Sequence, residues 1–314
     1  MIGETTEDKI LERLAKTKLE YGQLPRAVEL YDELLRLQRE VRSRVVVTSA
    51  SLTEEEVDKR LNNKKPILEF GNLSLDWVLV QEAFMSIVEA VVGYVEVIAE
   101  AESQYCMSYW PNCLEDIRAC NIWVESITSS TFPLHQAVED WYQGSSLVAI
   151  ALASGISEEL LGAIIRATMQ PFLKVCSDGL IGLVNQKQWR RRFCPVCGGE
   201  ADFAFLEKES GARWLLCSRC DAEWLFQRLK CPYCDTTNQK SLAYFTNDVG
   251  LYRLYVCDEC HHYIKAIDLR NTGSDVLLPL EKVVTIDLDR QAQENGYNAK
   301  WIGILPFDVI VEPC

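Results

Sequence analysis

The chain has 314 residues, 48% of them hydrophobic, and a formal net charge of −14 at pH 7, with an isoelectric point near 4.8. This length and composition allow a buried core and favour two domains over one. The negative charge repels phosphate backbones and anionic lipids, which disfavours nucleic acid as a partner.

The N-terminal segment lacks the pattern of a secretory signal. Residues 1–20, MIGETTEDKILERLAKTKLE, have no apolar core behind a basic start. The most apolar stretch, residues 78–101, is interrupted by Gln81, Glu82, Glu89 and Glu96, so no run is expected to span a bilayer. We therefore expect a cytoplasmic protein without membrane insertion.

Residues 1–188 are predicted to form an all-α domain. Apolar residues recur three and four positions apart in 9–23 and 26–45. Thr53 and Glu56 have the spacing of a capping box, and Ser157 is a plausible cap for a further helix.

After Trp189 the helical periodicity stops and short segments rich in aromatic and branched residues follow. Turn signals such as KESGA and TNDVG separate these segments, which predicts strands. The predicted strands are 201–207, 213–217, 223–229, 242–246, 251–257 and 263–269.

Four C-x-x-C pairs punctuate this β-rich half. In a long chain without a signal sequence they indicate metal ligands rather than disulfides. We call each pair a knuckle, because its turn aims two sulfurs at one point. The order knuckle, hairpin, knuckle, strand occurs twice. Rubredoxin-like and zinc-ribbon units are built in this order. The predicted metal ligands are Cys194, Cys197, Cys217, Cys220, Cys231, Cys234, Cys257 and Cys260.

The pairing of the knuckles is open to two arrangements. Sequential pairing closes two hairpins, whereas joining the second and third knuckles leaves the outer two to meet. Because residues 221–230 resemble a strand rather than a hairpin, sequential pairing is favoured. Four thiolates suit either zinc or iron, and a redox disulfide relay fits four regular pairs less well.

The residue after the second cysteine of each pair often needs a left-handed conformation, or must let the backbone approach the metal ligands closely. Backbone amide groups can then point at the cysteine sulfurs. Gly198 suits this position best. The other knuckles place Asp221, Asp235 and His261 there, and aspartate tolerates that conformation better than most residues.

Few residues point to catalysis. The three histidines, His135, His261 and His262, are too few for most acid–base chemistry, although one of the last two could hydrogen-bond or replace a thiolate. Walker, dinucleotide-binding and H-E-x-x-H motifs are absent from the sequence. We therefore expect no enzyme activity, no catalytic residues and no organic cofactor.

Two further clusters have simple interpretations. Cys106, Cys113 and Cys120 are spaced by seven but flank Pro111, and they are expected to be small buried hydrophobes rather than a third metal or redox site. Residues 190–192 are three consecutive arginines, too short a cluster for nucleic-acid binding, and a solvated linker is favoured over contact with an acidic partner.

The order of the motifs QPFLKV, Trp189, CPVCGG, CSRCDAEWLFQRLKCPYC and CDECHHYIKAIDLR, with the closing segment DLDRQAQENGYNAKWIGILPFD, resembles the formate dehydrogenase accessory protein (FdhE) family. The similarity covers the second half well and the first half in helix content. It implies an α+β multidomain protein: a helical domain (1–188), two tandem rubredoxin-like units (189–229 and 230–272) and a tail packed on them (273–314).

The resemblance also implies a function. Members of the family are non-enzymatic maturation factors that bind the catalytic subunit of a molybdenum- or tungsten-dependent formate dehydrogenase, so the eight cysteines are expected to hold two metal ions, zinc or iron. A rubredoxin-like electron-transfer protein is the alternative. A zinc-ribbon nucleic-acid-binding protein is a weaker one, because the chain is acidic.

Overall fold

The computed structural model describes residues 5–46, 52–101, 126, 130–247, 249–273 and 275–300, with side chains given outside 95–101. The chain divides into two compact units. The helical unit comprises Met1–Val45, Leu75–Pro171 and Ile302–Cys314, and the sheet unit comprises Val46–Ser74 and Phe172–Trp301. The domain boundaries at 188, 229 and 272 stay a prediction.

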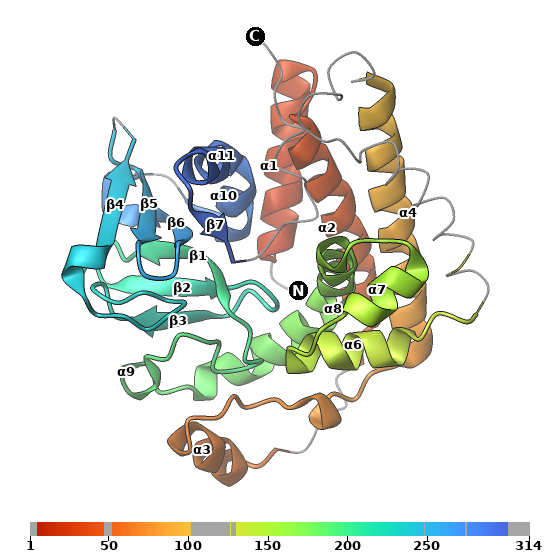
Figure 1. Ribbon diagram of the computed structural model, residues 1–314, viewed down its shortest axis with the longest axis horizontal. Helices are drawn as coiled ribbons and strands as arrows, with labels where there is room; N and C mark the ends of the chain where they lie inside the picture. Colours follow the sequence, from red (N-terminus) through yellow and green to blue (C-terminus); the bar gives the residue numbers. More distant parts are fainter. Residues whose placement is uncertain are drawn as a thin grey trace. The chain divides into compact units, whose positions relative to one another are not determined.

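The helical unit confirms the helical periodicity of the first half. Side chains with almost no exposure, including Ile10, Leu30 and Phe84, form its core, and α2 packs against both α1 and α4 (Figure 1). The Ser157 hydroxyl accepts from the Leu160 amide, as predicted for a helix cap. Its helices are α1 (Thr6–Tyr21), α2 (Arg26–Arg44), α4 (Trp77–Ala101), α6 (Leu134–Gln143), α7 (Val148–Ser154) and the first part of α8 (Glu158–Leu180).

Helix α4 is more apolar than the sequence analysis allowed. Its segment Trp77–Tyr94 is long and apolar enough to cross a membrane, which corrects the expectation that no such run exists. However, 44% of that segment is buried inside the protein, and its most enclosed side chains include Val80, Phe84 and Ile87. The core helix of a globular protein passes the same test of length and composition.

In the sheet unit, all six predicted strands are present, with ends shifted by no more than a few residues. Their aromatic and branched residues explain the match, because such side chains pack well in a sheet. The central strands β1 and β6 are buried on both faces, whereas β4 is largely exposed. The strands are β1 (Ala201–Leu206), β2 (Arg213–Cys217), β3 (Glu223–Phe226), β4 (Leu242–Thr246), β5 (Tyr252–Cys257), β6 (His262–Asp268) and a short β7 (Asn298–Ala299).

The two three-stranded repeats form one continuous sheet. Its order is β3-β2-β1-β6-β5-β4, with β7 beside β6. Neighbours within each repeat are antiparallel, but β1 and β6 pair in parallel, with Phe203 opposite Lys265 and Leu206 opposite Asp268. The second repeat therefore lies beside the first in the same orientation.

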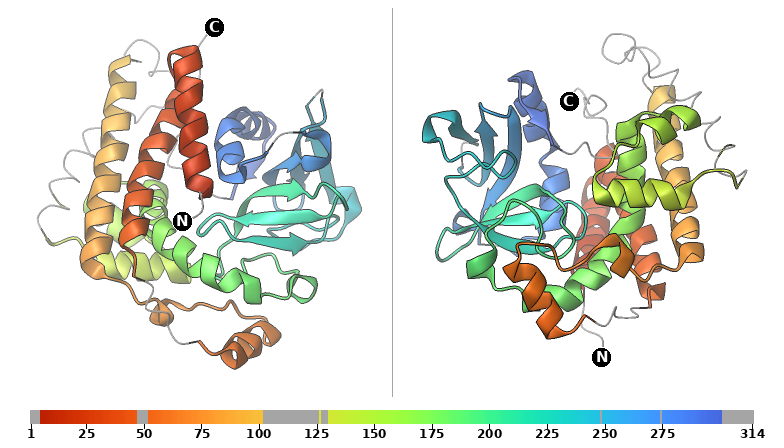
Figure 2. Two further views of the ribbon diagram at one scale, coloured as in Figure 1. Left: turned by 180° about the vertical axis from the view of Figure 1, so that it is seen from behind. Right: turned by 60° about the horizontal axis from the view of Figure 1, so that its bottom comes forward.

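Helices α10 (Leu278–Val284) and α11 (Ile286–Glu294) follow the second repeat in the chain, and α11 packs against β6 and β7 (Figure 2). A buried ion pair helps to hold them, because Lys265 Nζ lies 2.5 Å from Asp289 Oδ2 and also donates to the Lys282 carbonyl. The Tyr263 hydroxyl donates to the second Asp289 oxygen. Every charge in this contact therefore has a partner, as buried ions require.

The rest of the sheet unit consists of short helices and turns. Thr53 and Glu56 form the predicted capping box of α3. The remaining elements are α3 (Glu54–Asn62), η1 (Phe70–Asn72), the end of α8, η3 (Ile181–Leu183), α9 (Gln186–Trp189), η4 (Gln239–Ser241) and η5 (Leu269–Asn271).

The two outer edges of the sheet differ. On β3, the Gln186 side chain accepts from the Leu225 amide and donates to the Glu223 carbonyl, so it occupies the edge where another strand could pair. The outer edge of β4 pairs with no other strand of the described chain.

Asp268, at the end of β6, links two arginines and gives a test of this fold. It is fully buried, and its carboxylate binds Arg253 and Arg270, whose hydrogen bonds lower the pKa of Asp268 from 3.8 to about 2. The lowered pKa means that Asp268 stabilises the fold above pH 4, and this contribution is lost as the pH falls through about 2.

We expect Asp268→Asn to lower the free energy of unfolding at pH 7 by about 3 kcal/mol, because it leaves the Arg253 charge unpaired. Urea unfolding of the metal-loaded protein measures this change. The exposed pair of Asp287 with Arg290 provides the control, since Asp287→Asn should cost less than about 0.5 kcal/mol. Equal losses in the two variants would contradict the structural role of Asp268.

Candidate metal centres

Four cysteines of the first repeat converge on one point, which we call the first centre. The Cys197 sulfur lies 3.5 Å from those of Cys217 and Cys220, and the Cys194 and Cys220 sulfurs are 3.7 Å apart. All four residues are almost fully buried. Sequential pairing of the knuckles is confirmed.

These spacings fit a metal better than a disulfide. A tetrahedron with metal–sulfur bonds of about 2.3 Å has sulfur–sulfur edges of about 3.8 Å, whereas a disulfide bond is about 2.05 Å long. All eight knuckle cysteines are free. Backbone amides of Val196, Gly199 and Arg219 point at the sulfurs from 3.4 Å, which favours thiolates.

Burial makes a bare thiolate costly in the first centre. Desolvation, followed by the hydrogen bonds between the Cys194 thiol and the neighbouring sulfurs, raises the pKa of Cys194 well above its ordinary value. A divalent cation would supply the charge that stabilises four thiolates in this dry site. The donor set therefore fits zinc or iron.

All four knuckles use the same left-handed residue after their second cysteine, as the sequence analysis expected. The φ angle is +74° at Gly198, +52° at Asp221, +66° at Asp235 and +54° at His261. Three non-glycine residues thus hold a conformation that costs them energy. Their shared geometry indicates that both repeats build their knuckles in one way.

Two features that the sequence analysis missed enclose the first centre. The amides of Ile67 and Leu68 donate to the carbonyls of Pro195 and Val196, so a segment far along the chain holds the first knuckle. A Cβ at Gly199 would lie 2.9 Å from the Cys217 sulfur. Only glycine allows this approach of backbone to ligand.

The second centre consists of Cys231, Cys234, Cys257 and Cys260. The Cys231 and Cys260 sulfurs are 3.7 Å apart, and so are those of Cys234 and Cys257. Cys234 is exposed and Cys260 is half-buried, whereas the other two are buried. The second centre therefore has the same ligand set as the first but is open to solvent on one side.

The exposure of the second centre to solvent affects the pKa values of its cysteines. Burial raises the pKa of Cys231 far above its ordinary value and that of Cys260 to about 11. At Cys234, slight burial is outweighed by the Thr236 amide and the neighbouring thiols, and the pKa is lowered. Cys234 is thus the ligand most ready to meet solvent as a thiolate.

The histidines and arginines near the knuckles have structural roles. His262 Nδ1 lies 2.6 Å from the Cys260 carbonyl oxygen, and its ring packs on Tyr233. His261 is exposed at the left-handed position. Arg192 donates to the Tyr233 carbonyl, so the arginine cluster is not simply the solvated linker that was favoured. The third histidine, His135, is not near the knuckles: it packs on the Trp77 ring within the helical unit.

Cys176 lies near the first centre, on α8. It is half-buried, and its pKa is raised by burial and then by the nearby Cys220. Nothing in its sequence neighbourhood signalled this proximity. Cys106, Cys113, Cys120 and Cys314 lie outside the described residues.

Two metal ions per chain are the expected content, one in each centre. Cys194→Ser and Cys257→Ser should each reduce it to one, because a tetrahedral site with three thiolates binds more weakly. Elemental analysis of anaerobically purified protein, with a visible spectrum, checks the content and distinguishes iron from zinc. Cys176→Ser is the matched control and should retain two ions. Loss of both ions in either variant would contradict two separate centres.

The difference in exposure predicts an order of metal loss. A chelator should remove metal in two phases, the faster one from the second centre, where Cys234 is exposed. Metal release followed with a colorimetric chelator should lack the fast phase in Cys257→Ser and the slow phase in Cys194→Ser. A slow phase that disappears in Cys257→Ser would reverse the assignment.

Comparisons with known proteins agree with this geometry. Residues 193–228, which contain the first centre, match the family model "FdhE, central domain". An FdhE homolog of Aquifex aeolicus (strain VF5) is 35% identical over 156 residues, 48% of this chain and 54% of that protein. One from Shewanella oneidensis is 31% identical over 121 residues, 38% of each chain.

The chain thus spans about half the length of the curated relatives it matches, or less. The crystal structure of the FdhE protein from Pseudomonas aeruginosa superposes with a TM-score of 0.57, at 20% identity, over 96% of this chain and 94% of that one. Such low identity shows the fold alone. The chain therefore resembles FdhE proteins in the sequence of residues 193–228 and in its fold, which confirms the family resemblance indicated by its motifs.

Proposed function

We propose that this protein is a cytoplasmic accessory factor that binds the catalytic subunit of a molybdenum- or tungsten-dependent formate dehydrogenase and assists its assembly or activation. The observation that carries the proposal is the match of residues 193–228 to the FdhE central domain, joined to the two four-cysteine clusters. The eight cysteines Cys194, Cys197, Cys217, Cys220, Cys231, Cys234, Cys257 and Cys260 would hold one metal ion at each cluster.

The two centres would serve this function differently. The first is enclosed, and a metal there would fix β1, β2 and the first knuckle as a rigid base. The second has an exposed ligand, Cys234, so a client protein could reach its knuckles. We place client contact at the second centre for this reason.

A non-enzymatic role suits the chemistry of the sites. Four-thiolate centres leave no open coordination position for a substrate, unlike catalytic zinc sites. Of the histidines beside the second centre, His262 binds the Cys260 carbonyl and packs on Tyr233, whereas His261 holds the left-handed turn and is exposed. Binding and presentation are therefore the functions that these residues support.

Electron transfer is the second candidate, because four-cysteine sites also suit iron. It predicts a reversible redox potential and a visible absorbance that changes with reduction. A nucleic-acid-binding role predicts salt-dependent binding of DNA or RNA, and the net charge of −14 opposes it.

The test is to capture the proposed partner, the catalytic subunit of formate dehydrogenase, from a lysate that contains this enzyme. Tagged full-length protein should recover the catalytic subunit, identified by mass spectrometry, and the double variant Cys231→Ser/Cys234→Ser should lose about tenfold or more of it. Cys176→Ser is the control and should capture it normally.

A folding defect must be separated from loss of contact. The double variant should keep one metal ion and the near-ultraviolet circular dichroism of the first repeat. The proposal is wrong if metal-loaded wild-type protein recovers no formate dehydrogenase subunit from a lysate in which that enzyme is abundant.

A further inference from the structure

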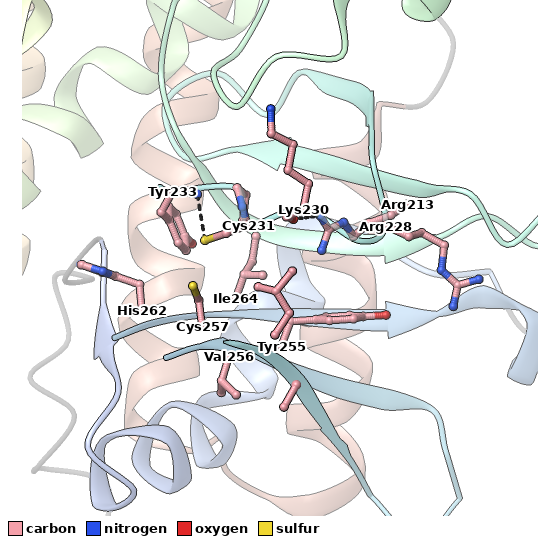
Figure 3. A pocket seen from close by; sticks show the side chains of 13 residues that line it. Arg213, Arg228, Lys230, Cys231, Tyr233, Tyr255, Val256, Cys257, His262 and Ile264 are labelled. Atoms are coloured by element: carbon pink, nitrogen blue, oxygen red, sulfur yellow. Dashed lines mark hydrogen bonds between the residues drawn. The ribbon is translucent and has the colours of Figure 1, made fainter. Parts of the chain in front are cut away.

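A small cavity of about 30 Å³ lies in the sheet unit, between the turn after β3 and strands β4 and β5. Figure 3 shows Arg213 and Arg228 at one end of it and Cys257 and His262 at the other. Its lining includes the second-centre ligands Cys231 and Cys257 but no aspartate or glutamate, although the chain as a whole carries a charge of −14. The space holds about two water-sized atoms.

Arg213, at the start of β2, is an unusual guanidinium. It is 2% exposed and forms no ion pair with any described residue. Nη2 donates to the Gln227 and Lys230 carbonyls, and the group stacks on Phe226 and Tyr255. Nε has no hydrogen-bond partner. Burial lowers the pKa of Arg213 to about 10, against the opposing effect of Tyr255 and Cys231, so the group stays charged at neutral pH and no carboxylate of the described chain binds it.

The internal repeat supplies the comparison. Arg253 in the second repeat occupies the same position, since both arginines stand four residues before a ligand cysteine. Each also lies opposite the last residue of its repeat's first strand, Arg213 opposite Leu206 and Arg253 opposite Thr246. Arg213 lies opposite Phe226, and Arg253 lies opposite Ala266. Two residues beyond Ala266 is Asp268, whose carboxylate is 2.6 Å from Arg253.

Two residues beyond Phe226, the first repeat has Arg228 instead of an aspartate. The carboxylate that neutralises Arg253 is therefore replaced by a second cation. Arg228 lies close enough to depress the pKa of Arg213, and it forms no ion pair within the described chain. Lys230, the third cation of the lining, is already paired with Asp235.

We propose that the cavity between Arg213 and Arg228 is a binding site for a carboxylate group. A carboxylate takes the place that Asp268 has in the second repeat, and its charge is shared by two guanidiniums. The cavity admits the two oxygens of such a group and little more. This site does not rest on the function proposed above.

The carboxylate can come from two sources. A free acid such as formate or acetate is small enough to enter alone. An acidic side chain of a partner protein can also reach the cavity, because Leu242 and Ala243 of the outermost strand β4 line it, and the outer edge of β4 is unpaired in the described chain.

The experiment is a titration of full-length, metal-loaded protein followed by the NMR signals of arginine Nε–H groups, at constant ionic strength and pH 7. The probes are sodium acetate, sodium formate and the peptide acetyl-Ala-Ala-Glu-Ala-Ala-amide, with its Gln counterpart as control. Saturable shifts with acetate or formate indicate a free acid as the ligand. Saturation with the Glu peptide alone indicates a protein segment, and either result supports the site.

Substitutions test whether the NMR shifts come from binding at this cavity. Arg228→Gln should weaken binding about tenfold, and Arg290→Gln, on exposed α11, should leave it unchanged. Arg228→Asp restores the residue type of the second repeat, so it should abolish binding and raise the midpoint of thermal unfolding. The proposal is overturned if no probe saturates, or if Arg228→Gln and Arg228→Asp bind as the wild type does.

Discussion

The parallel pairing of β1 with β6 is the contact on which the arrangement of both centres depends. Within each repeat, the middle strand is antiparallel to the first and ends at a ligand cysteine, Cys217 or Cys257. Because β1 and β6 run in the same direction, Cys217 and Cys257 lie at the same end of the sheet, where β2 and β5 both finish. Three strand spacings separate them, on the order of 15 Å, so one surface can present both centres.

The two repeats have kept the ligand geometry and diverged around it. The left-handed residue after each second cysteine is shared by all four knuckles, but only the first centre is covered by Ile67 and Leu68 and closed by Gly199. The repeats also differ two residues beyond the arginine's strand partner, where the second has Asp268 and the first has Arg228. A metal site tolerates these changes because its geometry is fixed by local turns, whereas its accessibility is fixed by distant segments.

This distinction explains what the sequence could predict. Strands, knuckles, the sequential pairing and the eight converging cysteines follow from local spacing, and these predictions were confirmed. The β1–β6 pairing, the cover by Ile67 and Leu68, and the neighbourhood of Cys176 join residues far apart in the chain, and no periodicity encodes them. The apolar run of α4 was underestimated because Gln81, Glu82 and Glu89 interrupt it, although all three lie on the exposed side of the helix.

The sheet unit buries several charged side chains. Arg213, Lys265, Asp268 and Asp289 are all nearly inaccessible to solvent, and each buried ion costs several kcal/mol before its partners are counted. Metal binding to four thiolates contributes about 10 to 16 kcal/mol in small domains, which can offset that cost. The enclosed first centre, with its ligand Cys217 at the end of β2, is therefore best placed to stabilise the sheet. The second centre, with Cys234 exposed, can lose or exchange its metal while the sheet persists.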